Sequence, residues 1–348
     1  MKNFISNHKY LIKDLYAYSK TKIHLVWLNV ITSTIVVFLG LKLSELVVSF
    51  VTNATYHKQM LIQLGWMIFS LTIASLLELF VKTKRFNLAE KYRVSHITKA
   101  SEVIIDTDFE NLLSEDFNEY KRITMDAISG PQSLLGVYIE HITTWLTQIV
   151  QLIFIGYFVF MLDLPMVFYV LLLIVSTMIY RTYQAKIIKK QKKEASFEHH
   201  KITYLTEKSS NFKVAKDMRL YGVQPWFKEI YESVQHKINL IIFNQTKVIL
   251  GGQFISGLII TLITGYGYYI FVERYLNNSI SLSELTFYTG ALSTLLINST
   301  SFVNASFDLI QDSHDITKIR KYYAYVENET ITPKELVPQK IKSIEFRN

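Results

Sequence analysis

Polar side chains recur at helical spacing in the last apolar stretch of the chain. They lie three or four residues apart, which places them on one face of a helix: Thr294, Asn298, Ser301 and Asn304. Hydroxyl and amide groups in this arrangement can line a pathway through a membrane. Hydrogen bonds between packed membrane helices would explain the same residues equally well. The stripe therefore predicts either a pathway lining or a helix–helix contact.

Catalytic, metal and nucleotide chemistry have little support in the sequence. The chain has no cysteine, which excludes disulfides and thiolate metal sites. His199 and His200 are adjacent, and no further ligand follows them at metal-binding spacing. Asp308, Asp312 and Asp315 share one helix face, which favours a solvated or helix-pairing role over a cation site. No phosphate-binding loop of the form G-x-x-x-x-G-K-[ST] occurs, so we expect no catalytic, metal-binding or cofactor-binding residue in this chain.

The elements that must position these residues are long apolar helices. Half of the 348 residues are hydrophobic and the mean hydropathy is +0.20, which is too apolar for an ordinary soluble protein. Apolar runs of roughly 20 residues recur, and each is long enough to cross a bilayer core of about 30 Å. The pattern predicts an all-α membrane protein with six spans: residues 23–51, 61–81, 138–162, the stretch from a tight turn at 163–165 to 180, 240–272 and 284–307.

The lysines and arginines predict which side of the membrane each loop faces. The loops after the first, third and fifth spans hold only Lys58 and Arg274, whereas nearly all other basic residues lie in the termini and in two long polar segments. By the positive-inside rule, both termini and both segments are cytoplasmic. The net charge of +8 then reflects membrane topology. We expect the chain to be embedded in the lipid bilayer, to bind other proteins and not to bind nucleic acid. The expected location is the cell (plasma) membrane, and the free use of Lys, Asn and Ile is typical of a bacterial source.

The two long cytoplasmic segments, residues 82–132 and 181–239, follow the second and fourth spans. If each folds as a helical hairpin, each arm has about 25 residues and reaches about 35–40 Å from the membrane. The hairpin tips then fall near residues 114–124 and 215–222. The second tip lies in an amphipathic stretch, FKVAKDMRLYGVQPWF at 212–227. A helix this short needs a partner surface to be stable in water, and a solvated turn is the alternative.

With these elements in this order, the chain resembles the transmembrane half of an ABC exporter, a type-1 transmembrane domain, over essentially its whole length. KDMRLYG at 216–222 resembles the second coupling-helix region, and DTDFENLLSEDFNEYKR at 106–122 resembles the region of the first. SISLSELTFYTGALSTL at 279–295 resembles the start of the sixth span, although a glycine is common in that family where Ser283 stands. IKSIEFRN at 341–348 resembles the first β-strand of a nucleotide-binding domain.

The resemblance implies four parts: an interfacial or cytoplasmic helix at 1–22, a six-helix transmembrane domain at 23–326, a linker at 327–340 and the start of a missing nucleotide-binding domain at 341–348. Because the ATPase motifs are absent, this chain by itself should not bind or hydrolyse ATP. We therefore expect a fragment of a longer ATP-dependent translocase. ATP and Mg²⁺ are implied only for the missing domain, which belongs to the same full-length chain or to a separate one.

The resemblance also implies partners and a mechanism. Two such subunits pair as a homodimer or a heterodimer, their spans line one export pathway, and two coupling helices transmit the movement of the ATPase domains. The positions that match these helices are Glu115, Phe117, Tyr120 and Arg122 in the first and Lys216, Asp217, Met218, Arg219, Leu220 and Tyr221 in the second. Phe117 and Tyr221 are expected to be aromatic anchors in sockets on the partner.

An ATP-independent channel or secondary carrier is the alternative from another class. Such proteins favour buried charges at mid-membrane and spans that glycine or proline interrupts. The predicted spans are continuous and hold few mid-membrane charges, which favours the exporter. The cargo stays open among peptides, lipids, drugs and other amphiphiles.

Overall fold

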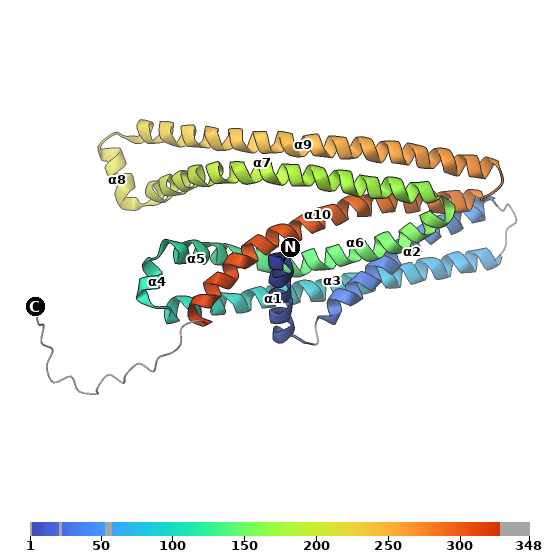
Figure 1. Cartoon of the computed structure of the whole chain (residues 1–348), viewed down its shortest axis with the longest axis horizontal. Coiled ribbons are helices and arrows are strands. Elements are labelled where there is room, and N and C mark those ends of the chain that lie inside the picture. The colour runs from blue at the N-terminus through green and yellow to red at the C-terminus, as the bar shows by residue number, and fades with distance from the viewer. Residues whose placement is uncertain (1, 21–22, 53–57, 328–348) are drawn as a thin grey trace, which may run out of the picture. The chain divides into compact units, whose positions relative to one another are not determined.

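The computed structural model of the chain is built from helices (Figure 1). It describes residues 2–20, 23–52 and 58–327, without the side chains of residues 2, 3, 189, 190, 192–197, 199 and 200. Within these residues the helices are α1 Lys2–Tyr18, α2 His24–Thr52, α3 Lys58–Asp106, α4 Phe109–Leu113, α5 Glu115–Ile128, α6 Leu134–Leu162, α7 Leu164–Ser210, α8 Phe212–Leu220, α9 Gln224–Leu276 and α10 Leu282–Glu327. The predicted linker beyond Glu327 and the predicted strand at 341–348 lie outside the described residues.

The contacts divide the chain into two compact units. Unit 1 comprises Met1–Ser33, Ala74–Leu146 and Asp308–Asn348, and unit 2 comprises Thr34–Ile73 and Thr147–Phe307. Four helices are continuous across these boundaries and contribute residues to both units: α2, α3, α6 and α10. Each unit has a hydrophobic core of its own.

The core of unit 1 is rich in aromatic residues. Tyr92, Phe117, Tyr138 and Tyr322 are fully buried in it, and they come from α3, α5, α6 and α10. Apolar side chains of α1 join the same core. A buried tyrosine needs a partner for its hydroxyl, and Tyr322 donates to the backbone carbonyl of Ala100 at 2.8 Å. These rings hold segments that are distant in sequence in one compact unit.

The first hairpin turns earlier than the sequence predicted. The five-residue α4 connects α3 to α5, and Ser114 caps the start of α5. The Oγ of Ser114 accepts a hydrogen bond from the backbone N–H of Phe117 at 3.2 Å, and two acidic residues follow in the first turn, where the helix dipole favours them. The prediction of a tip at 114–124 is therefore wrong, because the returning arm already starts at the beginning of that range.

Helices α7 and α9 form a long hairpin in unit 2 and pack along each other (Figure 1). They approach closely at Gly252 of α9, where a Cβ would lie 1.8 Å from the ring of Tyr180 on α7. The Tyr180 hydroxyl donates to the carbonyl oxygen of Val248 at 2.6 Å, and Nε2 of Gln184 donates to the same oxygen at 3.2 Å. Glycine at 252 therefore makes room for a polar contact between the two arms.

Helix α8 is the tip of this hairpin (Figure 1), as the sequence predicted to within a few residues. Oδ1 of Asn211 caps its start by accepting a hydrogen bond from the backbone N–H of Lys213 at 3.0 Å. At its end Gly222 has a φ of 64°, and the N–H of Val223 donates to the carbonyl of Met218 at 3.2 Å. This is the Schellman arrangement, in which glycine adopts the left-handed conformation without a Cβ clash. Local hydrogen bonds thus define both ends of α8.

Apolar surface identifies the chain as a membrane protein. Five helices in the described part are long and apolar enough to cross a bilayer: α2, α3, α6, the first part of α7 and α9. Large apolar side chains on these helices are exposed, including Trp66, Phe80, Phe168 and Leu262. Apolar surface of this extent is unstable in water, whereas hydrocarbon covers it. The chain is therefore an all-α, multi-pass membrane protein.

Helix α10 is not one of these five helices. Its first half includes the predicted sixth span at 284–307, where serine, threonine and asparagine side chains lower the hydropathy. The count of six spans thus stays a prediction.

Replacing Gly252 by alanine should destabilise the packing of α7 on α9. The new Cβ would meet the ring of Tyr180, which its hydrogen bond to Val248 holds in place. Overpacking of this kind costs roughly 1–3 kcal/mol, so the thermal unfolding midpoint of the purified protein should fall. Gly265→Ala on the same helix is the control, because a Cβ there has nothing within 4 Å. An equal fall of the midpoint in both variants would contradict this account of Gly252.

Candidate functional site

Helix α8 presents the residues expected in the second coupling helix at the surface of unit 2. Lys216, Asp217, Arg219, Leu220 and Tyr221 are exposed, and Met218 is partly buried. The exposed fractions of Leu220 and Tyr221 are 73% and 75%, although both are large apolar side chains. Cationic Lys216 and Arg219 lie on the same short helix. A small apolar surface with positive charge beside it is suited to docking on a protein partner.

The residues expected in the first coupling helix lie on α5 in different surroundings. Glu115 and Arg122 are exposed, and the Arg122 guanidinium is 3.6 Å from the Asp126 carboxylate one turn later. Tyr120 is partly buried, and its hydroxyl accepts a hydrogen bond from Lys321 of α10 at 3.2 Å. These contacts make α5 part of the packing of unit 1 as well as part of its surface.

Phe117 does not present its ring to a partner. It is fully buried, and its ring packs against the rings of Tyr322 and Tyr325 on α10. The expectation that Phe117 is an anchor for an external socket is therefore wrong, because Phe117 lies on the inner face of the amphipathic α5. The exposed apolar residues at this turn are Phe109 and Leu113 of α4.

The polar stripe of α10 has two different roles. Nδ2 of Asn298 donates to Oε1 of Gln151 on α6 at 3.0 Å, and both side chains are buried, so Asn298 makes the helix–helix contact. Thr294 donates to a carbonyl of its own helix and Ser301 is partly buried. Asn304 instead lines a cavity of unit 2. The helix–helix alternative thus holds for Asn298, and the pathway lining stays a prediction for the other members of the stripe.

This cavity of about 220 Å³ lies between α7, α9 and α10 within unit 2. Its polar lining includes Arg181, Gln184, Gln253, Ser256 and Asn304. The guanidinium of Arg181 donates to Oδ1 of Asn304 and, at 3.3 Å, to Oε1 of Gln184. Sequence reasoning counted Arg181 only as one basic residue of a cytoplasmic segment. Its position directly after an apolar span was the one local signal.

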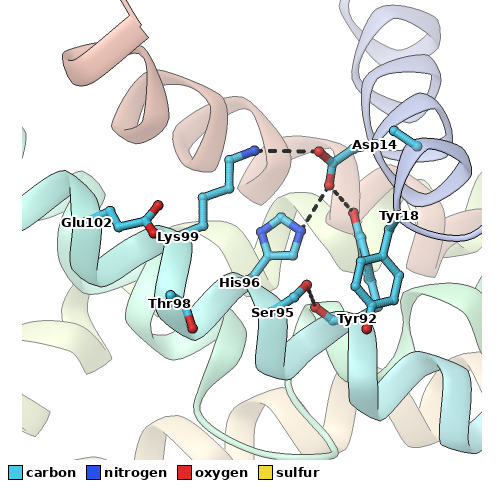
Figure 2. A pocket seen from close by; sticks show the side chains of 9 residues that line it. Asp14, Tyr18, Tyr92, Ser95, His96, Thr98, Lys99 and Glu102 are labelled. Atoms are coloured by element: carbon cyan, nitrogen blue, oxygen red, sulfur yellow. Dashed lines mark hydrogen bonds and ion pairs between the residues drawn. The ribbon is translucent and has the colours of Figure 1, made fainter.

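A second polar cluster joins α1, α3 and α10 within unit 1. Figure 2 shows its members on α1 and α3. One oxygen of the Asp14 carboxylate accepts a hydrogen bond from Tyr92 at 2.8 Å and lies 3.0 Å from Nε2 of His96. Nζ of Lys99 is 3.5 Å from the other oxygen. Nδ1 of His96 lies 2.8 Å from the hydroxyl of Tyr323, and only 2% of the His96 surface is exposed. Asp14 and His96 are 82 positions apart, so no local pattern could indicate the cluster.

The charges of this cluster indicate a structural role. Burial raises the pKa of Asp14, but the hydrogen bonds from His96 and Tyr92 and the charge of Lys99 outweigh it and lower the pKa to about 2. Burial raises the pKa of the Tyr92 and Tyr323 hydroxyls far above the ordinary value, so both stay protonated. A hydroxyl that resists deprotonation is a poor nucleophile. The cluster therefore fastens α1 to its neighbours, and Asp14, Tyr92, His96 and Lys99 line a pocket of about 410 Å³ (Figure 2).

The acidic face of α10 pairs with a neighbouring helix. Oδ2 of Asp312 lies 2.8 Å from Nδ1 of His141 on α6, and Asp312 is buried. This is the helix-pairing alternative that the sequence allowed. In the part of the chain that the structure describes, no group of three or more histidine, aspartate and glutamate side chains is placed to hold a metal ion. The side chains of His199 and His200 lie outside that part.

Comparison with known proteins does not assign the chain to a family. No family model matches the chain, and no curated protein matches it. The function proposed below therefore rests on the sequence pattern and on the geometry of the two units.

The Asp14→Asn substitution should loosen α1 from unit 1. It removes the charge shared by Tyr92, His96 and Lys99, and losing a charge-assisted hydrogen bond costs about 1.5–3 kcal/mol. Amide hydrogen exchange in α1 should accelerate and the unfolding midpoint should fall at neutral pH. Asp126→Asn is the control, because that carboxylate is exposed and its ion-pair partner among the described residues is the exposed Arg122, 3.6 Å away.

The same site gives the wild type a defined pH dependence. The folded pKa of Asp14, about 2, lies below the ordinary value of 3.8, so the stabilisation is complete above that value and is lost as the pH falls toward 2. Asp14→Asn should lack this part of the acid loss. Identical acid unfolding curves for the wild type and Asp14→Asn would contradict the assignment.

Proposed function

We propose that this chain is the transmembrane part of an ATP-driven exporter of the ABC exporter type. It pairs with a second transmembrane subunit, identical or different, and with nucleotide-binding domains that carry ATP and Mg²⁺. The observation that carries the proposal is α8, an exposed helix with defined ends at the tip of a long hairpin.

The length of the hairpin is the first support. Helix α7 has 47 residues, which at about 1.5 Å per residue extend about 70 Å. The hydrocarbon core of a bilayer is about 30 Å thick, so more than half of α7 lies outside it. A channel or carrier whose substrate site is at mid-membrane does not need arms of this length. A transporter that receives force from a cytoplasmic domain does.

The surface of α8 is the second support. A nine-residue helix is too short to be stable alone, yet α8 leaves Leu220 and Tyr221 exposed. The flanking hairpin and the two caps hold α8 in position, so these exposed side chains are available to a partner. The arms are continuous helices, and movement of a domain docked on α8 would be transmitted along them to the membrane.

The remaining support comes from charge and from the polar residues of α10. By the positive-inside rule, the distribution of basic residues favours a cytoplasmic location for both termini and both hairpins. The free use of Lys, Asn and Ile favours a bacterial cell. Helix α10 supplies the sixth span, and its side chains at Ser301 and Asn304 belong to the export pathway, whereas Asn298 pairs with Gln151. This division explains why α10 is more polar than the other spans.

ATP should change the accessibility of the pathway in the full-length protein assembled with its ATPase domains. This chain has no cysteine, so a cysteine introduced at Ser301 can be labelled alone once the ATPase domains are also cysteine-free. We expect ATP with Mg²⁺ to change the rate of maleimide labelling from the cytoplasmic side. Tyr221→Ala and Arg219→Ala should abolish that change while ATP hydrolysis continues, because both side chains are exposed and their loss leaves the fold intact.

Phe243→Ala is the matched control, since Phe243 is an exposed aromatic residue on α9 at a distance from the tip. It should preserve the effect of ATP. An unchanged effect of ATP on labelling in Tyr221→Ala and Arg219→Ala would contradict the coupling role of α8. A parent protein that does not respond to ATP would favour the ATP-independent carrier.

A further inference from the structure

Arg181 contributes a positive charge to the cavity of unit 2, and its partners there are neutral. The guanidinium donates to the amide oxygens of Asn304 and Gln184. Among the described residues, no carboxylate lies within ion-pair distance of it. A guanidinium has five N–H donors, so these two hydrogen bonds leave donors for a ligand. The cavity therefore holds a cation whose charge no carboxylate of the described residues neutralises.

The neighbouring amide groups hold this cation in position. Nε2 of Gln184 donates to the carbonyl oxygens of Val248 and Ile249 at 3.2 and 3.4 Å, which leaves Oε1 to face Arg181. Tyr180 strengthens the same contact between α7 and α9. The guanidinium is thus pre-organised, and pre-organisation lowers the entropy cost of binding.

Hydrogen-bond donors line this cavity beside Arg181. The hydroxyls of Thr177 and Thr300 donate to carbonyls of their own helices. Asn304 uses its oxygen on Arg181 and retains its NH₂ group. The side chains of Gln253 and Ser256 also line the cavity, and each can donate a hydrogen bond. Donors around one guanidinium match the oxygens of a phosphate or a carboxylate.

The size of the cavity limits what it can enclose. Its volume of about 220 Å³ is below the roughly 300–1,000 Å³ of sites that hold a drug-sized molecule, so a head group fits but a whole lipid does not. Leu250, Phe254 and Leu258 form an exposed apolar stripe on α9, four residues apart, next to the lining residues Gln253 and Gly257. A hydrocarbon chain can follow this stripe outside the cavity.

We infer that the unit 2 cavity binds the anionic phosphate or carboxylate head group of a membrane amphiphile, with the hydrocarbon chain along α9. The inference needs no ATPase domain. A negative result in the ATP experiment would therefore leave it standing, and its own failure would leave the exporter proposal untouched.

Lys247 separates this inference from a general role of basic residues at the membrane boundary. It precedes Val248, whose carbonyl bonds to Tyr180 and Gln184, so it lies at the level of Arg181 in unit 2. Its ammonium group is 4.3 Å from the centre of the Phe243 ring, and it does not line the cavity. Lys247→Gln thus removes one positive charge at the same level without changing the cavity.

The test measures lipid binding to the purified full-length protein in a neutral detergent. The probes are anionic dioctanoylphosphatidylglycerol, zwitterionic dioctanoylphosphatidylcholine with the same chains, and inorganic phosphate. The wild type should bind the anionic lipid at least about tenfold more tightly than the other two probes. Arg181→Gln should weaken binding of the anionic lipid at least about tenfold, and Lys247→Gln should leave it unchanged. The isosteric Asn304→Asp places a carboxylate against Arg181 and should weaken binding as Arg181→Gln does.

Four results would overturn the inference. Equal weakening by Arg181→Gln and Lys247→Gln would assign the effect to general surface charge. Equal affinity for the two lipids would show that the cavity does not distinguish the charge of the head group. Binding of phosphate as tight as that of the anionic lipid would indicate that the ligand is a small soluble anion. If Arg181→Gln fails to fold, Asn304→Asp decides, because full binding by that folded variant would contradict the role of Arg181.

Discussion

Where a chain crosses hydrocarbon, each backbone N–H and C=O group must find its partner within the protein, because no water is present to supply one. Continuous helices meet this constraint, and α7 and α9 continue for 47 and 53 residues. The same helices extend past the membrane and position α8. At that turn the helical ladder is interrupted. The side chain of Asn211 accepts a hydrogen bond from a free N–H at the start of α8, and the left-handed Gly222 lets the N–H of Val223 reach a carbonyl at its end.

The two polar clusters show how one protein uses charge in different ways. In unit 1, the Asp14 carboxylate lies within contact distance of three donors, Tyr92, His96 and Lys99. These contacts help to hold α1. In unit 2, the contacts of Arg181 with described side chains are to neutral amide groups, and Arg181 lines a cavity. A saturated charge serves the fold, whereas a positioned charge without a counterion is available to a ligand.

The two hairpin tips differ in how well the sequence predicted them. Both tips were predicted from the length of the hairpin arms, and at the second tip Gly222 and Pro225 also close an amphipathic stretch, a local signal that agrees with the prediction. The first was placed at the middle of its segment, although Ser114 with acidic residues after it is an N-cap signal. Phe117 was misread for another reason. Which face of α5 is inward depends on α10, about 200 residues later in the chain.

By itself the sequence determined that the chain is an all-α membrane protein with two long hairpins, because the length of apolar runs and the residues at turns are local properties. Only the tertiary structure decided which polar residues meet. Asn298 pairs with Gln151 across 147 positions, and Arg181 meets Asn304 across 123. Helical spacing places residues on one face, but the packing of distant helices determines whether that face meets lipid, a neighbouring helix or a cavity.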